Sequence, residues 1–286
     1  MKGFIKVIIV GAVILVLGIA VAVTALGVNG WQIDDDYEMK TYECADINKA
    51  IDVEFSAGSL EIGYYDADVI KIEYPENKNL SASIEEKDGK LSFETTNKRK
   101  WFSFEWLKKR PTTKIWLPKG DIVDLELEMN AGAVNIADGE FGKFDVSMNA
   151  GAFSMGEIKC REMSIDMNAG TMNLKNVTAN VKAEVDLSAG AMNIQSLISP
   201  IFHCDVSAGS VSVGLLKSGS TKIDLSAGSV DLLMEGSKKQ YEIAVKKSAG
   251  SCNVSNQSAS RPSGSTRRIM AEISAGSLYI RFESES

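Results

Sequence analysis

The sequence predicts an all-β protein: a β-solenoid (β-helix-like) of about nine coils, with an antiparallel β insertion near its N-terminal end, preceded by one transmembrane helix. Three observations lead to this prediction. A Ser/Asn-Ala-Gly motif recurs along the chain, apolar residues alternate on both sides of each motif, and 22 uncharged residues stand together near the N-terminus. We therefore divide the chain into a cytoplasmic tail (1–6), a transmembrane anchor (7–28), a juxtamembrane linker (29–50) and a solenoid domain (51–286).

The N-terminal run, residues 7–28, is rich in Val, Ile, Leu, Ala and Gly. As a helix it would reach about 33 Å, enough to cross the hydrocarbon of a bilayer. Lys2 and Lys6 precede it, and the positively charged flank of a span stays in the cytoplasm. We expect a single-pass protein of the cell membrane with a cytoplasmic N-terminus and an extracellular body. The alternative is a cleaved signal peptide with Ala20-Val21-Ala22 at the cleavage site, although such apolar regions usually span about 7–15 residues.

The motif occurs nine times, and its glycines are spaced by 19 or 20 residues through the middle of the chain and by 22 and 26 near the end. A repeat this short cannot bury an apolar face alone, so the repeats must stack on one another. The nine glycines that mark the structural repeat are Gly58, Gly132, Gly151, Gly170, Gly190, Gly209, Gly228, Gly250 and Gly276.

Each repeat has the same pattern around its glycine. The preceding residue is Ala in all nine copies, and the residues two and four positions after the glycine are apolar in all nine. The alternation shifts by one residue at the glycine, which indicates a corner or bulge that keeps the apolar side inward. Asn130, Asn149 and Asn168 begin successive motifs, and identical polar residues on stacked strands form hydrogen-bonded ladders. The alternative is a sandwich of repeated hairpins.

Residues 64–118 do not follow the repeat. Two apolar runs flank Lys87-Asp88-Gly89-Lys90, where Asp-Gly is typical of a tight hairpin turn. We interpret these residues as an antiparallel insertion that caps the N-terminal end of the stack, because an uncovered end is a bare strand edge.

Within the insertion, residues 98–110 carry six basic side chains and one acidic side chain, with four aromatic residues between the two basic clusters. Basic groups beside aromatic rings suit an anionic lipid surface or wall polymer. The alternative is a pair of cap strands whose rings fill the core. The candidate ligand- or membrane-contacting residues are Lys98, Arg99, Lys100, Trp101, Trp106, Lys108, Lys109 and Arg110.

Acidic residues recur four positions before the motif glycines, where stacking would place them in one outward-facing column. Adjacent carboxylates repel one another, and Ca²⁺ relieves such repulsion with oxygen ligands. Solvated surface charge and a catalytic carboxylate row, as in pectin-cleaving β-helix enzymes, are the other interpretations. The Ca²⁺ candidates are Asp166, Asp186, Asp205 and Asp224.

Several functions find no support in the sequence. His203 is the only histidine, and no GxSxG elbow or His/Cys metal motif is present. The net charge is −7, which disfavours nucleic-acid binding. The cysteines lie far apart and are interpreted as buried small side chains rather than disulfides. We therefore expect no catalytic residues, no cofactor and no nucleic-acid partner. The four cysteines are Cys44, Cys160, Cys204 and Cys252.

Three further sequence features carry a resemblance to a known family: YYDADVIKIEY at residues 64–74, KIWLPKG at 114–120, and repeats such as DVSAGSVSV at 205–213 and DLSAGSVDL at 224–232. Together with the N-terminal span, they resemble the bacterial "putative adhesin" family, a β-strand-repeat domain of unknown function in envelope proteins. The resemblance implies an extracytoplasmic solenoid without an assigned enzymatic activity, often linked to envelope-stress regulation.

We accordingly expect a non-enzymatic binding, adhesion or scaffold module of the cell envelope, with the membrane as one partner and wall polymer, anionic lipid or another envelope protein as candidates for the other. Two alternatives remain open at this point. One is a carbohydrate-active β-helix enzyme, and the other is a stress-sensing regulator that signals through a membrane partner.

Overall fold

The computed structural model describes residues 37–44, 50–98, 111–120, 122–254 and 266–284. They belong to one compact unit, here called the strand domain, and the expected transmembrane anchor at 7–28 lies outside them. Among the described residues, no helix is long and apolar enough to cross a bilayer. The elements are β1 (Glu38–Cys44), β2 (Ala50–Tyr65), β3 (Ile70–Glu76), β4 (Leu80–Lys87), β5 (Lys90–Asn97), β6 (Thr113–Pro118), β7 (Val123–Ile136), β8 (Gly139–Met167), β9 (Thr171–Ser237), the 3-10 turn η2 (Lys238–Gln240), β10 (Tyr241–Val254) and β11 (Arg267–Ser284).

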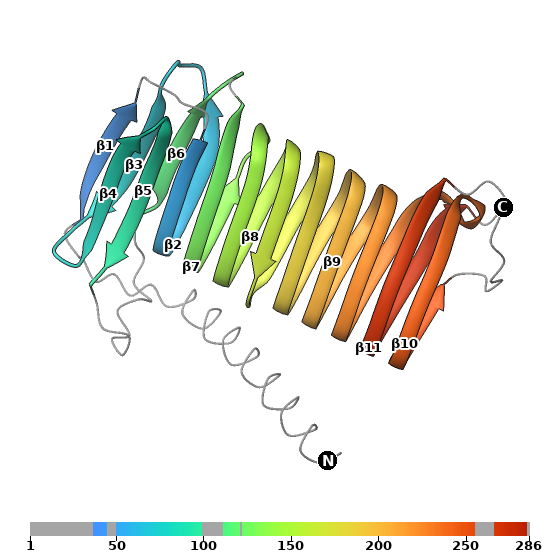
Figure 1. The fold of residues 1–286 in the computed structure, drawn as a ribbon. Coiled ribbons are helices and arrows are strands. Elements are labelled where there is room, and N and C mark those ends of the chain that lie inside the picture. Colours follow the sequence, from blue (N-terminus) through green and yellow to red (C-terminus); the bar gives the residue numbers. More distant parts are fainter. Residues whose placement is uncertain (1–36, 45–49, 99–110, 121, 255–265, 285–286) are drawn as a thin grey trace, which may run out of the picture. The chain divides into compact units, whose positions relative to one another are not determined.

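The nine motif glycines stack directly on one another, as the repeat predicted. Figure 1 shows the strands that carry them side by side in one stack. Gly58 pairs with Gly132, and Gly132 pairs with Gly151, in parallel strands. Along β8 and β9 the packing is so close that a Cβ atom added to Gly170 would lie 2.2 Å from the carbonyl oxygen of Gly151. The same contact recurs from Gly190 through Gly228. The repeats therefore form one stack of parallel strands rather than separate hairpins.

The apolar columns on both sides of the glycines form the core. At the position two residues after the glycine, eight of the nine side chains are at most 2% exposed. The ninth, Cys252, is half-buried because it belongs to the outermost strand, β10. Each repeat thus covers the apolar side of its neighbour, which is the reason that a 19-residue unit can be stable in a stack.

The predicted asparagine ladder is present. The Nδ2 atom of Asn149 donates a hydrogen bond to Oδ1 of Asn130 at 2.8 Å, and Nδ2 of Asn168 donates to Oδ1 of Asn149 at 2.9 Å. These bonds link three successive repeats beside the glycines, so they hold the register of the corner.

At the C-terminal end, the order of the strands departs from the order of the sequence. The sheet runs β1-β3-β6-β2-β7-β8-β9-β11-β10, so β11 lies between β9 and β10. Gly276 of β11 pairs with Gly228 on one side and with Gly250 on the other. The eighth repeat, in β10, is therefore the one that does not pair with the repeat before it in sequence.

The N-terminal end is closed by strands outside the repeat, as expected, but the pairing is mixed rather than purely antiparallel. The β4–β5 hairpin turns at Asp88 and Gly89, and β3 pairs antiparallel with both β1 and β6. However, β5 pairs in parallel with the N-terminal half of β2, and β6 pairs in parallel with its C-terminal half. The rings of Tyr74 and Phe93 pack edge to face, with their centroids 5.6 Å apart. The Tyr42 hydroxyl donates a hydrogen bond to the Glu86 carboxylate. β1 lies in the segment that we assigned to the juxtamembrane linker, so part of that segment belongs to the strand domain.

The cysteines behave as small core side chains. Cys44, Cys160 and Cys204 are buried, Cys252 is half-buried, and none of these four described cysteines forms a disulfide. Burial raises the pKa of the Cys160 thiol to about 12, so it stays protonated and unreactive at neutral pH.

Candidate functional site

The main chemical feature of the described surface is a column of acidic side chains four residues before the motif glycines. Asp166 pairs with Asp186 on the next repeat, and Asp224 pairs with Glu272 of β11. Stacking brings together all four residues that we had singled out. It also adds acidic neighbours that we had missed. In stacking order the column contains Glu94, Glu54, Glu128, Ser147, Asp166, Asp186, Asp205, Asp224, Glu272 and Lys246.

The missed members differ in how visible they were in the sequence. Glu54 and Glu272 stand four residues before Gly58 and Gly276, so the repeat itself could have identified them. Glu94 has no such signal, because it belongs to the insertion and reaches the column only through the pairing of β5 with β2.

A second polar column lies two residues earlier on the same strands. Asp52 pairs with Glu126, and Glu126 pairs with Asp145. His203 lies in this column and is exposed, as expected, with its Nδ1 atom 3.6 Å from Oε1 of Glu184. The face before the glycines therefore carries a mostly acidic row and, beside it, a mixed row in which four of the nine repeats contribute an acidic side chain.

The acidic side chains raise one another's pKa values. Partial burial raises the pKa of Asp186, and the charges of Asp205 and Asp166 raise it further. The pKa of Glu54 is raised by burial and then by Glu94 and Glu128. In each case the ionised form is disfavoured by lost hydration and by like charges one strand away.

Lysine side chains relieve part of this repulsion. The Nζ atom of Lys222 lies 2.5 Å from Oδ2 of Asp224, and Nζ of Lys90 lies 3.0 Å from Oδ2 of Asp52 and 2.9 Å from Oε2 of Glu126. These bases come from single positions rather than from a column.

The geometry gives the Ca²⁺ interpretation no support. Within the described part of the chain, no group of three or more His, Cys, Asp or Glu side chains is placed to hold a metal ion. Carboxylates on successive strands point the same way at about 4.8 Å spacing, whereas Ca²⁺ needs six to eight oxygens converging from several directions.

The basic-aromatic candidates lie almost entirely outside the described residues, which resume at Pro111. Lys98 is described: its side chain is exposed, and its backbone N–H donates to the carbonyl oxygen of Asn79 at 2.8 Å. Arg99, Lys100, Trp101, Trp106, Lys108, Lys109 and Arg110 stay a prediction from the sequence.

Comparisons with solved structures match this chain to three bacterial proteins. A "putative adhesin" from Bacteroides fragilis aligns over 87% of this chain and 100% of its own length, at 14% identity and a TM-score of 0.54. A "putative cell adhesion protein" from Clostridium sporogenes (14% identity, 87% and 100% coverage) has a TM-score of 0.30. A "putative adhesin" from Parabacteroides distasonis (11% identity, 86% and 98% coverage) has a TM-score of 0.42. The first likeness shows a shared fold.

Among curated proteins, no match was found. The family model described as Toastrack DUF4097 matches residues 48–286, which covers the strand domain from β2 onward and leaves out β1. The chain therefore belongs to the DUF4097 Toastrack family.

Proposed function

We propose that this protein is a non-enzymatic binding module held on the outer side of a bacterial membrane by residues 7–28, and that its basic-aromatic segment, residues 98–110, contacts anionic lipid beside that anchor. The observation that carries the proposal is where these two segments join the strand domain. Both join it at the same edge of the N-terminal cap.

The distance between the two junctions can be bounded from the strand pairing. Glu38 of β1 is the partner of Glu76, and Asn79 is hydrogen-bonded to Lys98. Glu76 and Asn79 are three residue steps apart along the chain, a distance of about 11 Å at most, and each pairing adds about 5 Å. The chain thus arrives from the anchor within about 20 Å of the point where the basic-aromatic segment leaves.

The length of the linker supports contact with the bilayer. Only residues 29–36 separate the predicted span from Tyr37, and a chain of that length reaches about 30 Å when fully extended. The cap edge is then kept close to the membrane surface. Six basic side chains attached there experience the potential of anionic lipid, which falls off within a Debye length of about 8–10 Å.

The charge distribution favours the same orientation. The segment carries six basic residues and one acidic residue, while the rest of the chain after residue 28 carries 23 basic and 37 acidic residues. An anionic surface attracts the first and repels the acidic columns of the stack. The stack is then directed away from the membrane, where its exposed polar faces are available to envelope partners.

The experiment uses the full chain in proteoliposomes with a Trp31→Phe substitution, so that Trp101, Trp106 and Trp116 remain. Brominated anionic lipid should quench the fluorescence of Trp101 and Trp106, and brominated zwitterionic lipid should quench it less. Trp116 lies in β6 and serves as the internal control in a Trp101→Phe/Trp106→Phe variant. Equal fluorescence with and without brominated anionic lipid would refute the lipid contact. If soluble wall polymer abolishes the quenching, the polymer is the preferred ligand of this segment.

A further inference from the structure

The strand β11 occupies a position that the chain first passes over. After the last repeat of β9, the chain forms β10 one position further out and then returns with β11 between them (Figure 1). β11 pairs in parallel with β9 from Arg268 to Ser284 and with β10 from Arg267 to Ile280. It is therefore an inserted strand with a complete neighbour on each side.

Burial shows that β11, and not β10, completes the core. Five side chains of β11 are at most 2% exposed, whereas Tyr241 is the one buried side chain of β10. At the inward position three residues before the glycine, β10 carries the exposed Lys247 where β11 carries the buried Ile273. The buried side chains of β11 are Ile269, Ala271, Ile273, Leu278 and Ile280.

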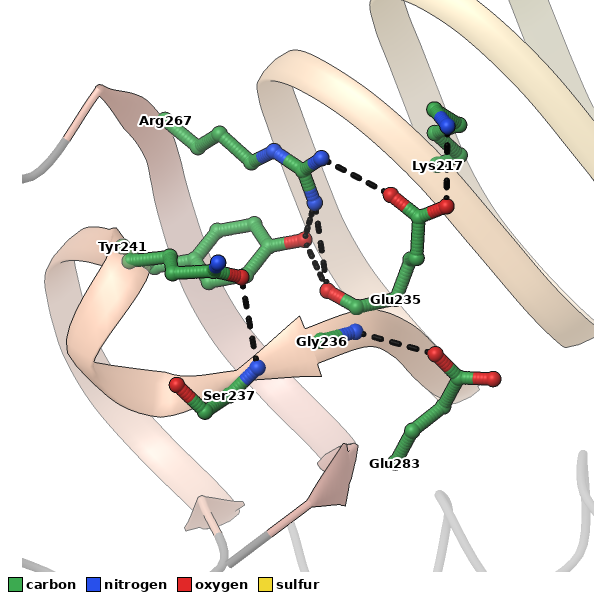
Figure 2. A network of polar contacts seen from close by, with 8 residues as sticks. Lys217, Glu235, Gly236, Ser237, Tyr241, Arg267 and Glu283 are labelled. Atoms are coloured by element: carbon green, nitrogen blue, oxygen red, sulfur yellow. Dashed lines mark hydrogen bonds and ion pairs between the residues drawn. The ribbon is translucent and has the colours of Figure 1, made fainter. Parts of the chain in front are cut away.

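The first residue of β11 makes a specific contact with the end of β9 (Figure 2). Nη2 of Arg267 donates to Oε2 of Glu235 at 2.7 Å, and Nη1 donates to the Glu235 carbonyl oxygen at 3.2 Å and to the Tyr241 hydroxyl at 2.8 Å. Lys217 of the preceding repeat holds the other oxygen of the Glu235 carboxylate at 2.9 Å. The guanidinium is thus directed into a preformed acceptor.

The far end of β11 contacts the same turn. Oε2 of Glu283 accepts a hydrogen bond from the backbone N–H of Gly236 at 3.0 Å (Figure 2). Arg267 and Glu283, from opposite ends of one strand, therefore both recognise the turn Glu235–Ser237, at which β9 leaves the stack. Among the nine repeats, this one alone combines an arginine nine residues before the motif glycine with a glutamate seven residues after it.

We propose that the position between β9 and β10 is a strand-acceptor site that takes β11 of a second copy of this chain as well as its own β11. An exchanged β11 would make the same backbone pairs, the same core contacts and the same contacts through Arg267 and Glu283. The two arrangements then differ only in the connection and in the entropy of association, so exchange depends on protein concentration.

The connection is long enough to reach another molecule. Within a regular repeat, seven residues (214–220), of which Leu216 and Ser218 are also buried, lie between Val213 and Thr221. Between Val254 of β10 and Ile269 of β11 there are 14 residues (255–268). The longer connection costs little additional loop entropy and allows β11 to extend to a neighbouring acceptor.

The test is a cross-link between differently tagged full-length copies, co-expressed in one membrane in a Cys252→Ser background. Ser229 and Ser277 are directly paired between β9 and β11, so one copy carries Ser229→Cys and the other carries Ser277→Cys. A single chain with both substitutions reports whether β11 is in its own acceptor. The control pairs Ser229→Cys with Ser210→Cys, which lie on adjacent repeats of one chain and are not brought together by exchange of β11.

We expect oxidation to join the two tags through Ser229→Cys and Ser277→Cys, and not through the control pair. Arg267→Ala should accelerate appearance of the joined product by about tenfold or more, because several hydrogen bonds hold the strand in place. The proposal would be overturned if the single chain with both substitutions forms its internal disulfide while the two differently tagged copies never become cross-linked. Equal joining of the control pair would also overturn it, since it would show collision rather than exchange.

Discussion

Replacing Gly170 with alanine tests how the stack is held together, because two separate penalties coincide at this residue. Its φ is +122°, a conformation that side chains rarely adopt. An added Cβ would also lie 2.2 Å from the Gly151 carbonyl oxygen, which is backbone and cannot move aside without separating two strands. Each penalty amounts to about 1–3 kcal/mol, so Gly170→Ala should destabilise the strand domain by about 4 kcal/mol.

Two other glycines separate the penalties. Gly120 has a φ of +93° and nothing within 4 Å of an added Cβ, so Gly120→Ala reports backbone strain alone. Gly209 has no such φ, but its Cβ would lie 2.7 Å from the Gly190 carbonyl oxygen and 2.9 Å from Cδ2 of Leu187, so Gly209→Ala reports close contact without backbone strain. We expect about 1–3 kcal/mol for each of these controls.

The assay is thermal unfolding of the full chain in detergent, followed by circular dichroism. For a domain of this size, 1 kcal/mol shifts the midpoint by about 2–4 °C, so Gly170→Ala should lower the Tm by about 8–16 °C. A loss for Gly170→Ala no larger than that for Gly120→Ala would refute the reasoning, because the contact between stacked glycines would then contribute nothing.

Three further predictions concern the ladder, the acidic column and the outer edge. Asn149→Ala should lower stability by about 1–2 kcal/mol in the same assay, because Asn149 bonds to both neighbours, and Asn149→Ser should lose less. Asp186→Asn should raise the Tm at pH 7, because the raised pKa of Asp186 in the folded state means that its ionisation destabilises the fold. The gain in Tm should shrink as the pH falls through that pKa, because the wild-type side chain then becomes protonated and neutral. A gain that does not change with pH would contradict this prediction. Lys247→Ile should increase self-association in light scattering, because an inward-pointing charge protects the edge strand β10, whereas Lys246→Ile should have less effect because Lys246 faces outward toward Glu272.

The stacking of the repeats could be predicted because it depends on local pattern. Each Ala-Gly step, each alternating apolar pair and the run of Asn130, Asn149 and Asn168 shows its role within one repeat. Residues that share a repeat position were therefore placed together correctly, the acidic column included.

The exchange of position between β10 and β11 could not be predicted in the same way, because strand order is a long-range property. The widened spacing before Gly250 and Gly276 indicated a change without specifying it. Lys247 carried more information: a charge in a core column marks its repeat as the outermost one. The parallel pairing of β5 and β6 with β2 also depends on distant partners, whereas the Asp88-Gly89 turn was evident locally.

The most direct test of the stack is a series of distances by pulsed electron paramagnetic resonance. One spin label at Asn135 would be paired in turn with labels at Asn193, Ser212, Tyr279 and Asn253, which share one repeat position, in a variant with Cys252 replaced. At about 4.8 Å per strand, we predict about 14, 19, 29 and 34 Å. Distances that do not rise by about 4.8 Å for each strand between the labels, or a longer distance to Tyr279 than to Asn253, would contradict the stacking order described above.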